Sequence, residues 1–250
     1  MKCLRISIRV VTVCLICLGL WQGLIMTAGL PPFLLPGPPA VAKALLTHHQ
    51  VLGPAMLRTM TEVLAGFVLG ASMGFVLALN MAAFPRFAHV LRPILLVTQV
   101  IPIFAPAPIL TLWLGYGMAP KILVTALICF FPVAAAFLDG LARTSPACLD
   151  LARVMGARNW RLLLQIRVAM ALPDPGSGLT LAAIYAPVGA VVGEWVGGSE
   201  GLGAVMIHAN GRMRIDLAVA ALSMVVLIAL GFHALVRASV RQAFARFNPQ

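Results

Sequence analysis

The sequence predicts an all-α integral membrane protein, and three observations carry this prediction. Of its 250 residues, 61% are hydrophobic and only 10% are charged, whereas soluble domains carry roughly 25% charged residues. A chain of this composition could not cover its surface with polar groups, so its solvent must be lipid. The third observation is a set of six apolar segments of about 17 to 25 residues, the length that crosses a bilayer core. We therefore expect one membrane domain over residues 1–250.

The first expected span could be mistaken for a signal peptide, because it follows Lys2, Arg5 and Arg9. It nearly spans a bilayer, however, and no convincing small-x-small cleavage site follows it. We therefore expect an uncleaved first helix. The six expected spans cover residues 8–30, 59–83, 91–114, 121–138, 178–196 and 217–236.

The third span is expected to be broken. Its prolines remove backbone donors and must kink or interrupt a helix; they are Pro93, Pro102, Pro106 and Pro108. Broken backbone at membrane depth is tolerated only where protein or a water-filled cavity covers it. This segment should therefore face other helices or a pathway, and not bulk lipid.

The basic residues predict a multi-pass protein with both termini in the cytoplasm. The net charge is +11, but the basic residues cluster between apolar runs, as topology signals do, and form no aromatic-interleaved surface for nucleic acid. With the N-terminus inside, thirteen of the eighteen Lys and Arg residues fall on the cytoplasmic side. Lys121, at the start of the fourth span, is counted among the five outside.

Two spans carry glycines at every fourth position, which places each set on one helix face. Missing side chains on such a face let another helix approach closely. The sets are Gly66, Gly70 and Gly74 in the second span, and Gly189, Gly193 and Gly197 in the fifth.

The longest connection, residues 139–175, lies on the expected cytoplasmic side and contains the run DLARVMGARNWRLLLQIRVAMALP from Asp150. Its pattern predicts helix from Asp150 to Gln165, interrupted at Gly156, where a glycine permits a turn that other residues resist. Two short amphipathic helices should meet at this bend. They could lie among lipid headgroups or dock into a groove of a cytoplasmic partner.

This loop resembles the EAA loop of permeases from binding-protein-dependent ABC importers, whose pattern is E-A-A-x(3)-G-x(9)-I-x-L-P. Asp150 and Ala152 stand at the first and third positions, Gly156 at the glycine and Ile166 at the isoleucine. Asp replaces Glu at the first position, and Ala169 stands where the proline is usual. Pro173 matches a second proline that is common four residues after the first. Ala157 and Trp160, which follow the glycine, are also expected to belong to the coupling loop.

The resemblance extends through PPFLLPGPPAV, IPIFAPAPILTLWLGYG and GAVVGEWVGGSEGLGAVMIHAN. These stretches look like the subfamily that moves nitrate, taurine, aliphatic sulfonates and pyrimidine thiamine precursors, and the last two look most like permeases for hydroxymethylpyrimidine-type precursors. The resemblance implies a type I ABC importer permease fold with its core at residues 56–237 and a coupling loop at 139–175.

The resemblance also implies the partners. Two permease copies would form a homodimer in the bacterial inner membrane. An ABC ATPase dimer, which itself binds ATP and Mg, would dock at the cytoplasmic loop, and a periplasmic binding protein would deliver solute. No cofactor or metal is expected in this chain. The residues show no catalytic constellation, and none of the three lysines follows a glycine, so a Walker A loop is excluded.

Glu194 is the carboxylate deepest in an apolar run, and we expect it to be the only ionisable residue so placed. A charge there costs about 2.5 to 3.5 kcal/mol on insertion scales. It could line the pathway or gate on one helix face with Pro187, pointing to a central cavity, or it could reach water at the outer interface. A secondary transporter or channel, the rival class, would show several such residues or paired broken helices.

Other pathway candidates are polar or helix-breaking residues near the expected outer half. Gln99, beside Pro102, could hydrogen-bond a polar solute or another helix. His208 and Asn210 lie in the expected outer loop after the fifth span, where they could contact solute or binding protein, or simply face water.

Overall fold

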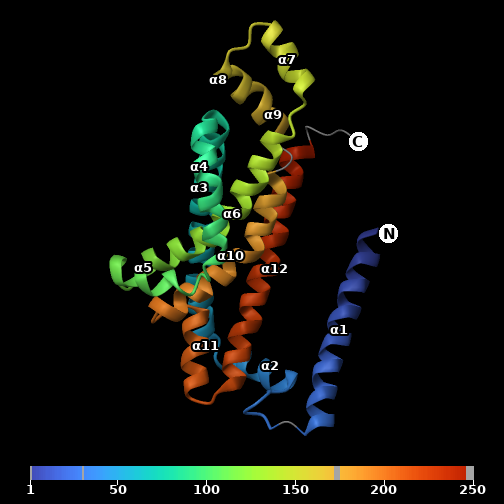
Figure 1. Ribbon diagram of the computed structural model, residues 1–250. Coiled ribbons are helices and arrows are strands. Elements are labelled where there is room, and N and C mark those ends of the chain that lie inside the picture. Colours follow the sequence, from blue (N-terminus) through green and yellow to red (C-terminus); the bar gives the residue numbers. More distant parts are fainter. Residues whose placement is uncertain (1, 30, 172–174, 246–250) are drawn as a thin grey trace.

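The computed structural model describes residues 2–29, 31–171 and 175–245, and within these ranges the chain forms helices joined by turns, with no strand (Figure 1). The helices are α1 (Lys2–Ala28), α2 (Pro38–Thr47), α3 (His49–Ala83), α4 (Pro85–Val100), α5 (Pro106–Leu114), α6 (Met118–Ala142), α7 (Pro146–Val154), α8 (Asn159–Arg161), the π-helical turn η1 (Leu162–Arg167), α9 (Val168–Ala171), α10 (Pro175–Gly197), α11 (Leu202–Gly211) and α12 (Ile215–Ala245).

Four helices, α3, α6, α10 and α12, are long and apolar enough to cross a membrane. They contain the expected second, fourth, fifth and sixth spans. Helix α6 packs against both α3 and α10, and α12 packs against the other side of α10. The short helices α7 to α9 lie at one end of this bundle, the loop end, and α2 and α11 lie at the other, the α11 end (Figure 1).

The two glycine rows explain why α6 lies at the centre, and the predicted close helix approach is confirmed. A Cβ atom on Gly74 would lie 2.7 Å from the carbonyl oxygen of Phe130 in α6. From the other side, a Cβ on Gly189 would lie 2.7 Å from Cα of Thr125. Real Cβ atoms do not approach other atoms so closely. Both α3 and α10 therefore use glycine to bring their backbones against α6.

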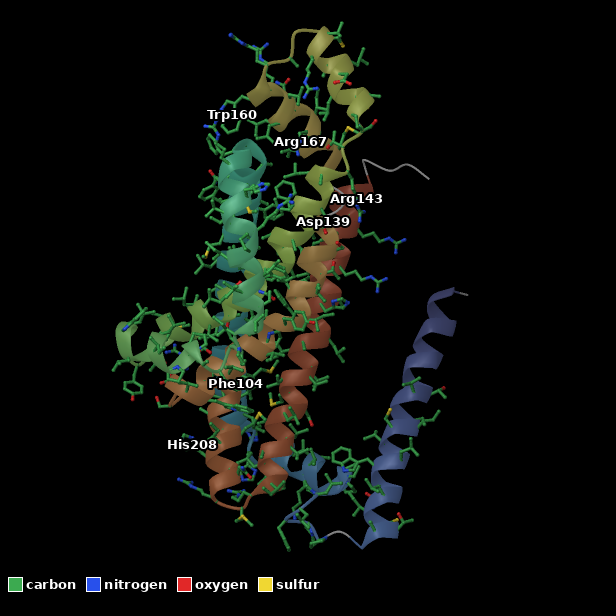
Figure 2. All side chains as sticks on the ribbon, viewed as in Figure 1. Phe104, Asp139, Arg143, Trp160, Arg167 and His208 are labelled. Atoms are coloured by element: carbon green, nitrogen blue, oxygen red, sulfur yellow. The ribbon has the colours of Figure 1, made fainter. Side chains whose placement is uncertain are left out.

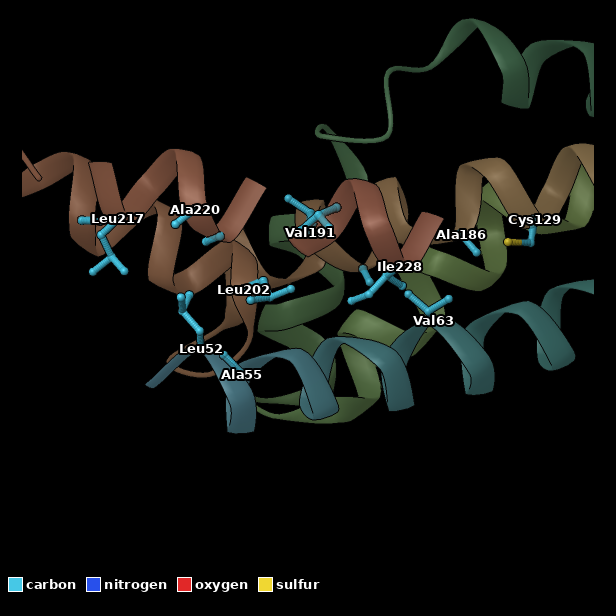
Figure 3. Packing of buried hydrophobic residues seen from close by; sticks show 14 of the residues in the cluster. Leu52, Ala55, Val63, Cys129, Ala186, Val191, Leu202, Leu217, Ala220 and Ile228 are labelled. Atoms are coloured by element: carbon cyan, nitrogen blue, oxygen red, sulfur yellow. The ribbon is translucent and has the colours of Figure 1, made fainter. Parts of the chain in front are cut away.

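The main apolar core lies between α3, α10, α11 and α12 (Figure 3). Leu52 and Val63 of α3 and Ala186 and Val191 of α10 belong to it, and all four are buried. Small buried alanines on α10 and α12, such as Ala186 and Ala220, allow the helices to pack closely.

The first and third expected spans differ from simple membrane helices. The first is helical as α1, but α1 stands beside the bundle and contacts α2, while Trp21 reaches the core (Figure 1). The third is broken, as its prolines predicted: α4 ends at Val100 and α5 begins at Pro106. Neither half, of 16 and 9 residues, is long enough to cross a bilayer alone.

The predicted bend in the long connection is confirmed. Gly156 has φ +85, the left-handed region that favours glycine, and it separates α7 from α8. The first short helix begins earlier than predicted, at Pro146, because proline suits the first turn of a helix. The second helical stretch continues to Ala171. Arg167 fixes it to the end of α6 by donating to the carbonyl of Leu141 at 3.1 Å. Pro173 lies outside the described residues.

Candidate functional site

A groove opens where the third segment is broken. It has a volume of about 720 Å³, within the usual range for small-molecule sites. Its walls come from the end of α4 and the turn that follows, from α6 and from α10. Gln99 and Pro102, both singled out from the sequence, line it together with Thr98. The broken backbone therefore borders a cavity, as physical chemistry requires of irregular backbone at membrane depth.

The groove combines aromatic and polar groups. Phe131 of α6 and Tyr185 of α10 offer ring faces, and the exposed amide of Gln99 offers a donor and an acceptor. The hydroxyl of Thr98 donates to its own helix at the carbonyl of Leu95, 2.7 Å away. Phe104 holds the break against α10 by stacking on Trp195, with ring centroids 6.1 Å apart.

Charged groups lie only toward the loop end of the groove. Asp139 and Arg143 both belong to the last turns of α6 and its cap (Figure 2). The middle of the groove is thus neutral among its described lining residues, which suits an uncharged polar solute better than an ion.

The loop on both sides of Gly156 presents apolar side chains to its surroundings. Val154 is 87% exposed and Met155 78% exposed, and Leu151 and Trp160 are also exposed. Ala152 is buried within the loop, and Asp150 pairs with Arg153 at 2.7 Å on the surface. Figure 2 shows Trp160 at the loop end, far from the bundle core. Contiguous exposed apolar surface is typical of interaction sites.

Glu194 is neither at an interface with water nor in the groove lining. Its side chain is fully buried, so the expectation that it reaches water at the outer interface is wrong. Pro187, expected to share an open face with it, is buried too. The expectation that Glu194 is the only deep ionisable residue is also wrong, because Glu62 of α3 and Lys121 of α6 are buried beside it.

These three residues form what we call the charge cluster: Glu62, Lys121 and Glu194. Lys121 Nζ donates to Glu62 Oε1 at 2.9 Å, with the two side chains 3% and 0% exposed. Lys121 was counted among the outer positive charges that indicate topology, but it serves instead as the partner of a buried carboxylate. Removing one member of such a pair typically costs about 3–5 kcal/mol, because the other charge stays buried without compensation.

The glycines of GEWVGGSEGLG shape the space around the charge cluster. A Cβ on Gly193 would lie 2.8 Å from Cα of Lys121, and one on Gly203 would lie 2.7 Å from Oε2 of Glu194. Gly201 has φ +109, and a Cβ there would overlap the Glu194 carboxylate. This motif is therefore a backbone cradle for one buried carboxylate and one buried ammonium group.

A second cavity, of about 650 Å³, opens at the α11 end, and we call it the basic pocket. Arg58 of α3 lines it and pairs with Glu200 at 3.0 Å. His208 also lines it, but on helix α11 (Figure 2). The expectation that His208 and Asn210 lie in a loop is therefore wrong, since both belong to α11. The remaining basic residues of its lining are His48, Arg212 and Arg214.

Apolar membrane-length helices with a groove at a broken span are the arrangement expected of the membrane subunit of a transporter. The profile of the family described as "binding-protein-dependent transport system inner membrane component" matches residues 66–245. The chain belongs to this family and is a permease of an ABC importer.

Relatives and a solved structure agree with this assignment. A probable ABC transporter permease protein of Haemophilus influenzae is 47% identical over 213 residues, covering 85% of this chain and 87% of the relative. The riboflavin transport system permease of Chloroflexus aurantiacus is 34% identical, covering 86% of this chain and 81% of the relative. The formylaminopyrimidine transport permease of Halalkalibacterium halodurans is 35% identical, covering 69% of each chain.

The fold resembles that of a solved importer. A chain of the MetNI methionine ABC transporter, in an inward-facing conformation, superposes with a TM-score of 0.55 at 20% identity, covering 76% of this chain and 94% of that chain. This likeness confirms the predicted type I permease fold. The family is a non-enzymatic membrane component, and its importers work with a separate ATPase and a binding protein.

Proposed function

We propose that this permease carries a pyrimidine thiamine precursor, such as hydroxymethylpyrimidine, through the groove between α4, α6 and α10. The observation that carries the proposal is the pairing of flat and polar groups in that groove. Phe131 and Tyr185 can stack on a heteroaromatic ring, and Gln99 can hydrogen-bond its ring nitrogens or amino group. Two relatives that are at least 34% identical are named for formylaminopyrimidine and riboflavin, both nitrogen heterocycles.

The exposed apolar surface of the loop supports a docking role. Val154, Met155 and Trp160 would enter a groove of an ABC ATPase, with α7 as the coupling helix, in the helix-in-groove mode of recognition. A helix that lies among lipid headgroups would keep its apolar side chains toward the bundle and the membrane, whereas this loop projects beyond the end of α6 (Figure 2). ATP and Mg would be bound by the ATPase dimer.

The arrangement of the chain supports a cytoplasmic position for the loop end. Helix α12 runs from the α11 end to the loop end, and α1 begins beside the middle of α12 and runs toward the α11 end (Figure 1). The loop end also holds Arg143 and the four arginines of the loop, as the positive-inside rule expects. Both termini would then be cytoplasmic in the inner membrane, and the basic pocket would face the binding protein. A second copy of the permease would close the open side of the groove as a homodimer.

Uptake by proteoliposomes tests the proposal. The permease, reconstituted with its ATPase and loaded with ATP inside, should accumulate radiolabelled hydroxymethylpyrimidine or formylaminopyrimidine only when binding protein is present outside. Uptake should stop without ATP, because the permease itself holds no energy source.

Other outcomes would change the assignment in defined ways. Accumulation of taurine, an aliphatic sulfonate, nitrate or riboflavin in place of the pyrimidine would overturn the proposed solute. Equal uptake with and without ATP would indicate a channel or secondary transporter and overturn the proposed mechanism.

A further inference from the structure

Buried side chains of the charge cluster and of Thr59 tie helix α11 to three membrane helices. Thr59 of α3 donates its hydroxyl to Glu194 Oε1 at 2.6 Å, and its oxygen accepts the backbone N–H of Leu202 at 2.9 Å. Glu194 Oε2 accepts the N–H of Gly203. The first two residues of α11 are therefore held by side chains from α3 and α10.

A third tie comes from α6. Lys121 Nζ donates to the carbonyl oxygen of Glu200 at 2.9 Å, in addition to its bond with Glu62. Three of these contacts, made by Thr59, Glu194 and Lys121, reach the backbone just before or within the first turn of α11. Helix N-termini expose unsatisfied N–H groups, and here the first two, of Leu202 and Gly203, are bound by side chains of other helices and not by a local side-chain cap.

The same membrane helices continue into the groove. Helix α6 holds Lys121 in its first turn, and its later residues Phe131 and Asp139 line the groove. Helix α10 lines the groove with Tyr185 and holds Glu194 two to three turns later. Helix α11, in turn, supplies His208 to the basic pocket. One buried network thus connects the walls of the groove with a wall of the basic pocket.

We propose that Glu62, Lys121, Glu194 and Thr59 are positioning residues for transport: they make α11 move as one body with α6 and α10, so that contact at the basic pocket is transmitted to the groove. The inference rests on the proposed docking of the binding protein at that pocket. None of the four lines the groove or the basic pocket, so they act through α11 and do not touch solute or partner.

Thr59 allows this role to be separated from simple stabilisation. Thr59→Val keeps the shape of the side chain but removes the hydroxyl and its three hydrogen bonds, to Glu194, to Leu202 and to the carbonyl of Ala55, while the Lys121–Glu62 pair stays intact. Thr59→Ser restores the hydroxyl and serves as the matched control. Each variant is reconstituted as the complete complex, and ATP hydrolysis is measured with and without the binding protein that supports uptake by the wild type.

We expect Thr59→Val to keep the basal ATPase rate and binding-protein affinity but to lose stimulation by at least about fivefold, the lower end of typical coupling strengths. Thr59→Ser should recover most of the stimulation. Thermal unfolding of each complex is followed in parallel, because a merely structural role would lower the midpoint and leave the stimulation ratio of the folded protein unchanged.

Two results would overturn the inference. One is full stimulation in Thr59→Val, whatever its unfolding midpoint. The other is failure of Thr59→Ser to recover stimulation, which would assign the effect to side-chain shape. A wild-type complex that transports solute without any stimulation by binding protein would contradict the docking proposal itself, and it would be seen before any variant is compared.

Discussion

Gly70→Leu is expected to prevent accumulation of the folded permease. Gly70 lies in the middle of the α3 glycine row, and a Cβ atom there would overlap the carbonyl oxygen of Ala126 in α6. The obstructing atoms are backbone and cannot rotate away, so α3 and α6 would have to separate along their whole contact. Overpacking costs typically about 1–3 kcal/mol and more where the backbone must shift. Yield after detergent extraction and the thermal unfolding midpoint measure the effect.

Gly231→Leu is the matched control for this substitution. Gly231 also lies within a membrane-spanning helix, α12, but nothing lies within 4 Å of the position that its Cβ would occupy. Its yield and unfolding midpoint should stay close to those of the wild type. Equal behaviour of the two leucine variants would contradict the close packing of α3 on α6.

Gly156→Val is expected to abolish most ATP-driven uptake while the protein still accumulates in the membrane. Gly156 has φ +85, and no atom lies within 4 Å of the place where its Cβ would be. The effect is therefore one of backbone conformation, not of steric contact. A left-handed conformation costs a residue with a side chain about 1–2 kcal/mol, and it suits β-branched residues least. The bend should open, and α7 should lose its place against the ATPase.

Gly156→Asn separates backbone strain at position 156 from the mere addition of a side chain, because asparagine tolerates the left-handed region. It should retain much of the uptake at equal protein level, and the ATPase should co-purify with it better than with Gly156→Val. Wild-type uptake in the valine variant would remove the bend from the coupling mechanism.

Much of the fold could be predicted because it depends on local sequence. Length and hydropathy identify α3, α6, α10 and α12, prolines locate the break before Pro106, and the glycine at position 156 locates the bend. Each of these features depends on the hydrophobicity or the allowed backbone conformation of a few neighbouring residues. The groove residues Gln99 and Pro102 were found for the same reason, since they lie at the break.

The charge cluster could not be predicted from local sequence. Glu62 and Lys121 lie 59 positions apart, and each stands near the end of an apolar run, where a charge ordinarily meets water. Only the packing of α3 on α6 through the glycine row brings them together. Helix α11 was missed as well, because ten residues are too few for a membrane span and its glycines indicate a loop. Its start is fixed by Thr59 and Glu194 from distant helices.

The groove between α4, α6 and α10 is the proposed pathway of this ATP-driven importer. Its most direct test is the reactivity of a cysteine at Gln99 toward a membrane-impermeant thiol reagent, in a transport-competent background without the five native cysteines. Leu96→Cys, on the same helix and exposed but outside the groove lining, is the control. We predict that the cysteine at position 99 reacts from the cytoplasmic side without nucleotide and from the outside when ATP and vanadate trap the complex. No reaction from either side in both states would contradict the claim.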